Sequence, residues 1–389
     1  MWVFLWAKLP KIPFRSTNIQ AWEGETIMTE RYPRVEVNLG HLRHNIKTVV
    51  EKCGAMGIDI AGVIKGATGL PEVAKAYDQE GAKWIASSRL EQIEDAINAG
   101  ITHPTMMIRV PMLSEVPEVI RLCDYSLNSE EVVLEALNEE AGKQGKIHNV
   151  IIMADMGDLR EGFWDKDEMA RVCKRIDDEM PNLHLAGIGT NLGCYGSINP
   201  TYEKEQELVD VAEKIEAVLG HKLEIISGGA TTSLPRIWEG HMPERINMLR
   251  VGEGIILARD LELFYNCPQP ELMKDNFRLK AEVIEVKDKP SHPVGEIAVD
   301  AFGHKPTYVD RGIRKRALLG IGKVDYADFG EIFPLEEGVE ILGASSDHTI
   351  LDIEDSPREW KVGDIVEFEI DYASVVFLTN TRNVHIVYK

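Results

Sequence analysis

Residues 58–65 read IDIAGVIK, a short apolar run that ends in a single lysine. From Tyr32 to about Leu261 the chain repeats this unit: an apolar run, a few polar residues and then a helical pattern. Near-continuous hydrophobicity is typical of parallel strands that are covered by helices on the outside. Seven further runs of this kind follow, at 84–88, 105–110, 125–129, 149–156, 185–192, 223–229 and 248–257.

Helical patterns separate these runs. In residues 205–219, Leu208, Ala212 and Ile215 fall at helical spacing among charged residues, and residues 38–57 give a further helix before the first run. Eight units in about 230 residues fit the size of a (β/α)8 TIM barrel. A doubly wound open sheet remains the structural alternative.

The pattern changes after Leu261. Residues 278–389 carry alternating runs that predict a mostly-β C-terminal domain, among them 281–286, 297–302, 316–321 and 365–370. Residues 265–275, with two prolines, form the expected linker. We therefore expect an N-terminal extension over 1–30, in which Met28 could be the functional start, a barrel over 31–265 and a β-rich domain over 266–389.

Composition excludes several classes of protein. Lys plus Arg number 43 against 64 Asp plus Glu, a net charge of −21 that disfavours nucleic acid or an anionic membrane as partner. No apolar run approaches the roughly 20 residues that span a bilayer. The five cysteines are far apart and contain no CxxC pair, so we expect neither a disulfide framework nor a thiolate zinc site. We expect a cytoplasmic protein.

Barrel enzymes place their reacting groups at the C-terminal ends of the strands. Lys65 stands at such an end, where desolvation could turn it into a Schiff-base former, although a solvated loop lysine is the more common case. Arg109 and Arg160 follow other runs; Arg160 could clamp a carboxylate, or pair with Asp158 or Glu161 in its own loop. Thr190 and Asn191 could face a ligand or cap the next segment.

The most informative stretch is Ser-Gly-Gly-Ala-Thr-Thr-Ser at 227–233. Its glycines permit close backbone approach, and its hydroxyls and amides precede a helix start, which favours an anion site. The next run carries Arg250, Gly252 and Gly254, and barrels commonly bind phosphate between these last two loops. A phosphate-bearing cofactor that binds a lysine covalently is pyridoxal 5'-phosphate.

At these residues the chain resembles the alanine-racemase-like, fold-type III pyridoxal-phosphate family, and within it the ornithine racemase branch, from about Arg31 to Lys389. The matching segments include IDIAGVIKGATG, ADMGDLREGFW, GIGTNLGCYG, LEIISGGATTSL and LRVGEGIIL, and ILGASSDHTILDIED in the C-terminal part. The resemblance implies a racemase that interconverts L- and D-amino acids by removing and returning the α-proton of a Schiff-base-bound substrate, with ornithine or lysine favoured.

The resemblance also implies the roles of individual residues. Lys65 would bind the cofactor covalently and act as one catalytic base. Arg250 would face the pyridine nitrogen, and Arg160 would steer the substrate carboxylate. The other expected cofactor contacts are Asn191, Ser227, Gly229, Thr231, Gly252 and Glu253, the last two through their amides.

This sequence departs from alanine racemase at several positions. Met153 stands where that enzyme has a carbamylated lysine, and Asn191 where it has a histidine. In alanine racemase the partner subunit contributes a catalytic tyrosine, which has no clear match here. Phe302 lies near that place in the sequence but has no proton to give. Asp300 is our weak preference for the second catalytic group, ahead of His304 and His348, and Ser346 and Asp347 are candidate substrate contacts.

The racemase interpretation, in which the β domain of one subunit completes the site of its partner, predicts a head-to-tail homodimer. The sequence shows no convincing Cys/His pair, so we expect no metal. An alanine or serine racemase is the alternative within the class. A decarboxylase or lyase on the same fold is a second alternative, and a non-enzymatic carrier of pyridoxal phosphate is the third; the sizeable C-terminal domain counts against the carrier.

Overall fold

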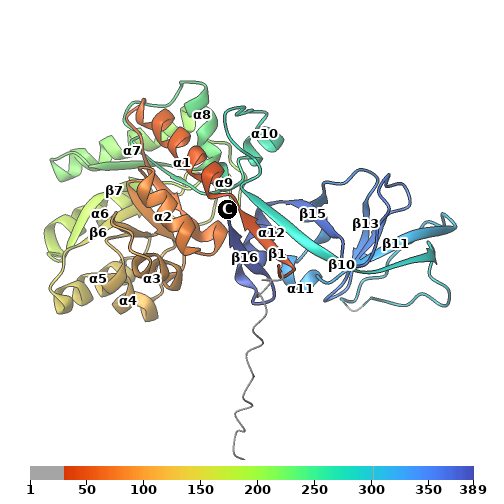
Figure 1. Ribbon diagram of the computed structural model, residues 1–389. Helices are drawn as coiled ribbons and strands as arrows, with labels where there is room; N and C mark the ends of the chain where they lie inside the picture. The colour runs from red at the N-terminus through yellow and green to blue at the C-terminus, as the bar shows by residue number, and fades with distance from the viewer. Residues whose placement is uncertain (1–29, 301) are drawn as a thin grey trace, which may run out of the picture. The chain divides into compact units, whose positions relative to one another are not determined.

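Eight parallel strands close into a barrel in the computed structural model, which describes residues 30–300 and 302–389 (Figure 1). All eight predicted runs form strands of this ring, and the last strand pairs with the first. The TIM barrel is therefore confirmed and the open sheet was wrong. The predicted extension at 1–30 lies outside the described residues except for Glu30. The barrel strands are β2 (Asp59–Val63), β3 (Trp84–Ser87), β4 (Thr105–Met107), β5 (Tyr125–Asn128), β6 (His148–Met153), β7 (Leu183–Gly189), β8 (Ile225–Ala230) and β9 (Met248–Val251).

Amphipathic helices surround the barrel strands (Figure 1). The predicted helix at 38–57 is α1, which begins after Asn38 because the side chain of that residue accepts a hydrogen bond from the His41 amide at 3.0 Å. The predicted helix at 205–219 starts slightly earlier, at Tyr202. The helices are α1 (Leu39–Gly54), α2 (Pro71–Gln79), α3 (Leu90–Asn98), α4 (Val116–Leu122), α5 (Glu131–Gln144), α6 (Lys166–Glu179), α7 (Tyr202–Leu219) and α8 (Leu234–Trp238).

The barrel interior is a packed core whose members alternate along each strand. Ile225 of β8 and Met248 of β9 belong to an inner cluster that also contains Met153. Since successive side chains of a strand point to opposite faces, Ser227 and Arg250 also point inward, one layer nearer the C-terminal ends of their strands. The polar site therefore begins directly above the apolar core.

The C-terminal part is a mostly antiparallel sheet, as predicted, with strand order β12-β15-β10-β11-β14-β13. The run at 297–302 was wrong as a strand, because residues 296–300 and 302 carry no regular structure and form part of the loop between β10 and β11. Its strands are β10 (Phe277–Pro290), β11 (Ile313–Leu319), β12 (Ile332–Pro334), β13 (Glu340–Ala344), β14 (Thr349–Asp352), β15 (Ile365–Ile370) and β16 (His385–Tyr388).

A strand that precedes the barrel completes this sheet. β1 (Arg34–Val37) pairs antiparallel with β10 and parallel with β16, and its Val35 and Val37 are fully buried. Two segments from opposite ends of the described chain therefore lie side by side, with the barrel inserted between them. The sequence pattern did not reveal this strand.

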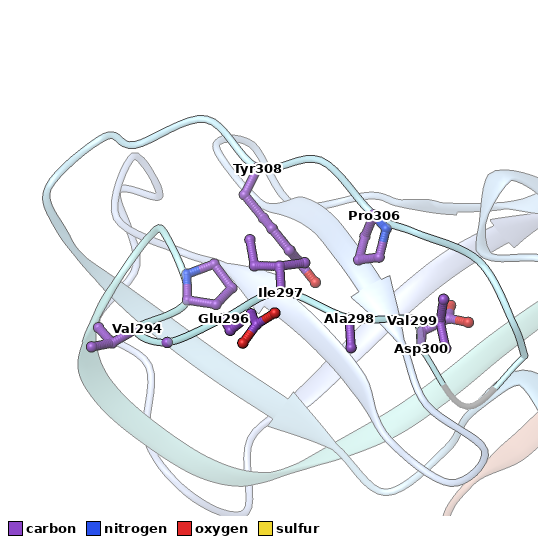
Figure 2. A pocket seen from close by; sticks show the side chains of 10 residues that line it. Val294, Glu296, Ile297, Ala298, Val299, Asp300, Pro306 and Tyr308 are labelled. Carbon is purple, nitrogen blue, oxygen red and sulfur yellow. The ribbon is translucent and has the colours of Figure 1, made fainter.

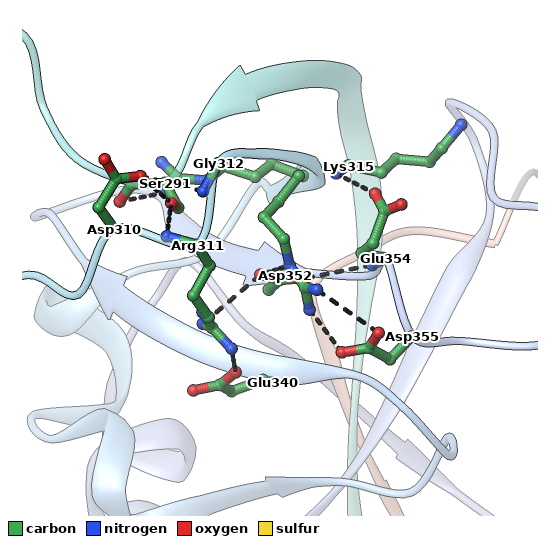
Figure 3. Close-up of polar contacts among 11 residues, drawn as sticks. Ser291, Asp310, Arg311, Gly312, Lys315, Glu340, Asp352, Glu354 and Asp355 are labelled. Carbon is green, nitrogen blue, oxygen red and sulfur yellow. Dashed lines mark hydrogen bonds and ion pairs between the residues drawn. The ribbon is translucent and has the colours of Figure 1, made fainter.

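An ionic network joins the outer strands of the sheet (Figure 3). Asp352 of β14 is almost fully buried and accepts a hydrogen bond from Arg314 Nε at 2.9 Å. Arg311 lies 3.5 Å from the same carboxylate and donates to Glu340 of β13 at 2.8 Å. These contacts link β11, β13 and β14 and hold the edge from which the loop at 291–312 emerges.

Candidate active site

Lys65 lies immediately after β2, in the short 3-10 helix η1 (Ile64–Ala67). Its side chain is half-buried, and among the described residues nothing forms a hydrogen bond or ion pair with its ammonium group. Burial lowers the pKa of Lys65, and the nearby cations Arg160 and Arg250 lower it further, against the opposite effect of Cys194 and Glu161. A lysine without a partner and with a lowered pKa can act as a nucleophile and as a base.

A tyrosine from the C-terminal part covers the segment that carries Lys65. Tyr372 begins α12 (Tyr372–Asn380), and a Cβ added to Gly66 would lie 2.8 Å from its ring carbon Cε2. Thr68 Oγ1 also donates to the carbonyl of Thr379, at 3.0 Å. Burial raises the pKa of Tyr372 to about 12, so its hydroxyl stays protonated at neutral pH. The sheet-bearing part of the same chain therefore contributes directly to the surroundings of Lys65.

Arg250 occupies the polar layer above the barrel core. Its guanidinium donates to Ser227 Oγ at 2.5 Å and to the Thr190 carbonyl at 2.8 Å, and the residue is 4% exposed. Burial lowers the pKa of Arg250 to about 10, which still leaves it charged at neutral pH. Arg250 thus ties together the ends of β7, β8 and β9 as a permanent cation. The expected cofactor contact Ser227 is a partner of this arginine.

Asn191 is a buried donor that lacks an acceptor. The residue is 8% exposed, and its Nδ2 has no hydrogen-bond partner. Its neighbour Thr190, by contrast, donates through Oγ1 to the Ala154 carbonyl at 2.9 Å. Leaving a buried amide unpaired costs about 1–3 kcal/mol, so a site that supplies an acceptor for Asn191 would gain this energy.

The two glycine-containing loops after β8 and β9 meet, as the sequence predicted. The Gly254 amide donates to Thr231 Oγ1 at 3.1 Å. Gly229 is the last residue but one of β8, which Thr231 follows, and Gly252 directly precedes the short helix α9 (Glu253–Ile256). The Glu253 side chain turns away from the loop after β8, because its Oε1 accepts the amides of Arg259 and Asp260 at 3.0 and 3.2 Å. That leaves the backbone amide of Glu253 as the group available to a phosphate.

Arg160 forms the loop ion pair that the sequence left open as one alternative. Its Nε and Nη2 both donate to the Glu161 carboxylate, Nε to Oε2 and Nη2 to Oε1, the latter at 2.5 Å. The pair raises the pKa of Arg160. Arg109 is committed elsewhere, with Nη2 2.8 Å from both carboxylate oxygens of Glu115. Of the two candidate arginines, only Arg160 is among the charged groups that act on Lys65.

Asp158 fastens the loop after β7 to the loop after β6. Its carboxylate is almost fully buried and accepts the amides of Gly193 and Tyr195, each at 3.0 Å. Thr232 Oγ1 holds the same segment from the other side by donating to the Leu192 carbonyl at 2.9 Å. This fixed segment carries Cys194, which is among the groups that act electrostatically on Lys65 and Arg160. From the sequence, Asp158 was predicted only as a possible ion-pair partner of Arg160, and no pattern pointed to Cys194 as part of the site.

The candidates of the C-terminal part lie in loops, where they are half-buried or exposed. Asp300 lies at the end of a pocket in the loop that follows β10, beside Val299 and near Pro306 (Figure 2). Its carboxylate accepts the amides of Phe302 and His304 at 2.9 and 2.8 Å, and these contacts lower its pKa.

Lys323 connects this loop with the segment of Ser346 and Asp347. Its ammonium lies 4.4 Å from the centre of the Phe302 ring and helps to lower the pKa of Asp300. Its amide donates to the Ser345 carbonyl at 3.0 Å, and Ser346 Oγ donates to Asp347 at 2.5 Å. We call Asp300, Phe302, Lys323, Ser346 and Asp347 the sheet-domain patch. Within the described part of the chain, no hydrogen bond or ion pair joins this patch to Lys65.

The remaining candidates have structural contacts. His304 Nδ1 lies 3.9 Å from Asp300 Oδ2, and the His348 carbonyl accepts the Ser345 amide at 2.8 Å. Across residues 30–300 and 302–389 there is no cluster of three or more His, Cys, Asp or Glu side chains that could hold a metal. Among the helices of this same part, none has the length and apolar character needed to cross a bilayer.

These residues fit pyridoxal phosphate. The unpaired Asn191 Nδ2 offers a donor inside the site, and Lys65 offers an amine without a competing partner. Arg250 supplies a fixed cation above the core, and the joined loops after β8 and β9 supply hydroxyl and amide groups at the strand ends where barrels bind phosphate. Of these groups, Asn191 Nδ2 and the Lys65 ammonium have no hydrogen-bond partner within residues 30–300 and 302–389, whereas Arg250 and Thr231 also bond to neighbouring groups of the site.

The chain is similar to several known racemases. The model of the alanine racemase N-terminal domain matches residues 37–260. The ornithine racemase of Acetoanaerobium sticklandii is 39% identical over 345 residues, which cover 89% of this chain and 96% of that protein. The lysine racemase of Thermotoga maritima is 39% identical over 358 residues, which cover 92% and 99%.

A solved structure shows the same fold. The alanine racemase of Bacillus anthracis with bound L-Ala-P has a TM-score of 0.72 at 17% identity, over 92% of this chain and 95% of that chain. At such low identity the likeness carries the architecture alone, a barrel followed by a β domain. The match of the domain model and the two 39% identical relatives go further, and by them the chain belongs to the alanine racemase family.

Proposed function

We propose that this protein is a pyridoxal-phosphate-dependent amino-acid racemase with ornithine or lysine as its substrate. The observation that carries the proposal is the position of Lys65, half-buried, without a partner and next to Arg160 and Arg250. The relatives named ornithine and lysine racemase support the reaction and the substrate.

Lys65 and Arg250 have different roles in the proposed reaction. When bound, pyridoxal phosphate withdraws electrons from the substrate and makes its α-proton acidic. Lys65 would bind the cofactor, and its Nζ takes or returns that proton on one face, which its lowered pKa favours. Arg250 stays charged and would keep a facing ring nitrogen unprotonated, which suits racemisation over transamination.

The phosphate would be held at the end of the barrel between β8 and β9. The groups that would bind it come from the ends of these two strands and the loops that follow them: Gly229, Thr231 and the amides of Gly252 and Glu253. Ser227 accepts a hydrogen bond from Arg250 and would orient its guanidinium. Asn191, whose Nδ2 lacks an acceptor, would bind an oxygen of the cofactor.

Glu161 provides a physical reason for a basic substrate. Arg160 and Glu161 form an ion pair beside Lys65, and a basic amino acid brings its own carboxylate and its own distal ammonium. Arg160 can exchange its partner for the substrate carboxylate while Glu161 takes the ammonium, so both charges stay paired. An alanine or serine substrate would leave the partly buried Glu161 without a partner, which costs energy.

The second face of the substrate requires another proton donor. We propose a head-to-tail homodimer in which the sheet-domain patch of one protomer faces the Lys65 site of its partner, with Asp300 as the second catalytic group and Ser346 and Asp347 as substrate contacts. The grouping of these residues around Lys323 supports a common role. We further propose that the enzyme acts in the cytoplasm on small-molecule substrates, without a metal, nucleic acid or membrane partner.

Polarimetry tests the proposed reaction. The purified protein, supplied with pyridoxal phosphate and single L-amino acids, should abolish the rotation of L-ornithine or L-lysine without releasing carbon dioxide or a carbonyl product. Released carbon dioxide or aldehyde would instead indicate a decarboxylase or lyase, and bound cofactor without turnover would indicate a carrier. Faster loss of rotation with L-alanine or L-serine would contradict the basic substrate.

A substitution at Glu161 separates substrate choice from catalysis. Glu161→Gln should raise KM for ornithine about tenfold or more and leave turnover of alanine no worse, because only the distal ammonium loses its partner. Equal effects on both substrates would show that Glu161 merely positions Arg160.

A further inference from the structure

Glu205 is a buried acid behind the turn between β8 and α8. It lies on α7 with no exposed surface, and a Cβ added to Gly228 would come within 2.7 Å of its Oε2. Its Oε2 has no hydrogen-bond partner, and its Oε1 lies 3.0 Å from the Ser233 hydroxyl. The carboxyl group therefore packs directly on the backbone of the glycine-containing turn.

The hydrogen bonds of Ser233 decide the protonation of Glu205. Ser233 Oγ lies 2.6 Å from the Gly228 carbonyl, which can only accept, and a serine hydroxyl carries a single proton. If that proton goes to the carbonyl, the contact with Glu205 needs a proton from the carboxyl group. Both contacts are satisfied at once only when Glu205 is a neutral acid that donates to Ser233.

The charged groups around Glu205 agree with this assignment. Arg250 on β9 and Arg236 on α8 are the cations that act on it, but Arg250 is bonded to Ser227 and Thr190, and Arg236 pairs with Glu239 at 2.7 Å. Neither reaches the buried carboxyl group. Burial raises the pKa of Glu205 to about 8, since an ionised carboxylate without a partner is costly inside a protein.

We propose that Glu205 is a positioning residue that, as a neutral acid, donates to Ser233 and thereby fixes the segment from Gly228, near the end of β8, to Ser233. Thr231, which binds the Gly254 amide, lies in the middle of this segment. The chain of contacts therefore runs from α7 through Ser233 to the loops that meet above β8 and β9. The link to cofactor affinity rests on the function proposed above, whereas the protonation of Glu205 does not.

Infrared spectroscopy tests the protonation directly. At pH 7 the protein without added cofactor should show, in the difference spectrum between wild type and Glu205→Gln, the carbonyl band of one protonated carboxylic acid; Glu253, whose pKa burial raises to about 7, contributes alike to both proteins and cancels. Ser233→Ala should shift this band, because the acid loses its acceptor. Glu213→Gln, on the exposed face of the same helix, should leave it unchanged. A wild-type spectrum that lacks the band, or one that Glu205→Gln does not alter, would overturn the proposal.

Titration with pyridoxal phosphate tests the positioning role. Glu205→Gln keeps a donor for Ser233 and should retain wild-type affinity, while Glu205→Leu should weaken binding about tenfold. Above about pH 8 wild-type affinity should fall more steeply than that of Glu205→Gln, because the other titrating groups of the site, Lys65 among them, act alike in both proteins. If Glu205→Leu does not fold, the pH profiles of the other two proteins still decide; identical profiles would overturn the role. No binding by any form would refute the proposed function and leave the infrared result standing.

Discussion

Replacing Glu205 by glutamine should stabilise the protein at neutral pH, by an amount that grows with pH. In the folded state the pKa of Glu205 is raised to about 8 from its usual 4.5. The native protein therefore binds one more proton than the unfolded chain between these values, and its stability falls as pH rises through this window. At about 1.4 kcal/mol per pKa unit, holding the proton costs about 3 kcal/mol at pH 7 and about 1 kcal/mol at pH 5.

Glutamine removes this cost because it is neutral in both states and can still donate to Ser233. Urea unfolding of wild type and Glu205→Gln, followed by tryptophan fluorescence at pH 5 and pH 7, should show a gain for the variant that is about 2 kcal/mol larger at pH 7. Glu213→Gln should show no such difference between the two pH values. A gain or loss for Glu205→Gln that does not change with pH would refute the assignment of a neutral buried acid.

Three further substitutions address other parts of the site. Gly66→Ala places a methyl group 2.8 Å from a ring carbon of the tyrosine that begins α12, and should lower the free energy of unfolding by about 1–3 kcal/mol, whereas Gly54→Ala, which meets nothing within 4 Å, should not. Asp158→Asn loses the charged acceptor of several amides and should speed limited proteolysis at residues 193–198; an unchanged cleavage rate would contradict the fastening role. Mixing inactive Lys65→Ala and Asp300→Asn protomers should restore activity through hybrid dimers with one intact site, and no recovery would contradict the shared site.

The sequence predicted the barrel and several site residues because their positions follow from strand geometry. Eight apolar runs defined eight strands, and residues at strand ends must meet at one rim of a closed barrel. Strand-end positions alone therefore group Lys65, Arg160 and Arg250 at one rim. The meeting of the loops after β8 and β9 followed from the same rule.

Other residues of the site depend on tertiary contacts that no local pattern encodes. Tyr372 reaches Gly66 from a helix far along the chain, and β1 joins a sheet whose other strands follow the barrel. Glu205 did leave a signal, because it falls on the same helical stripe as Leu208, Val209 and Ala212 and is therefore a polar residue on a buried face. The run at 297–302 alternates like a strand yet lies in a loop, since alternation alone does not supply a pairing partner.

Lys65 is the residue that we propose holds the cofactor. Borohydride reduction of the protein after incubation with pyridoxal phosphate, followed by digestion and mass spectrometry, should place the pyridoxyl group on the peptide that contains Lys65. Lys65→Ala should lose both the visible absorbance of the bound cofactor and the labelled peptide. Label on another lysine in the wild-type protein, or absorbance that persists in Lys65→Ala and is fixed elsewhere by reduction, would contradict the account.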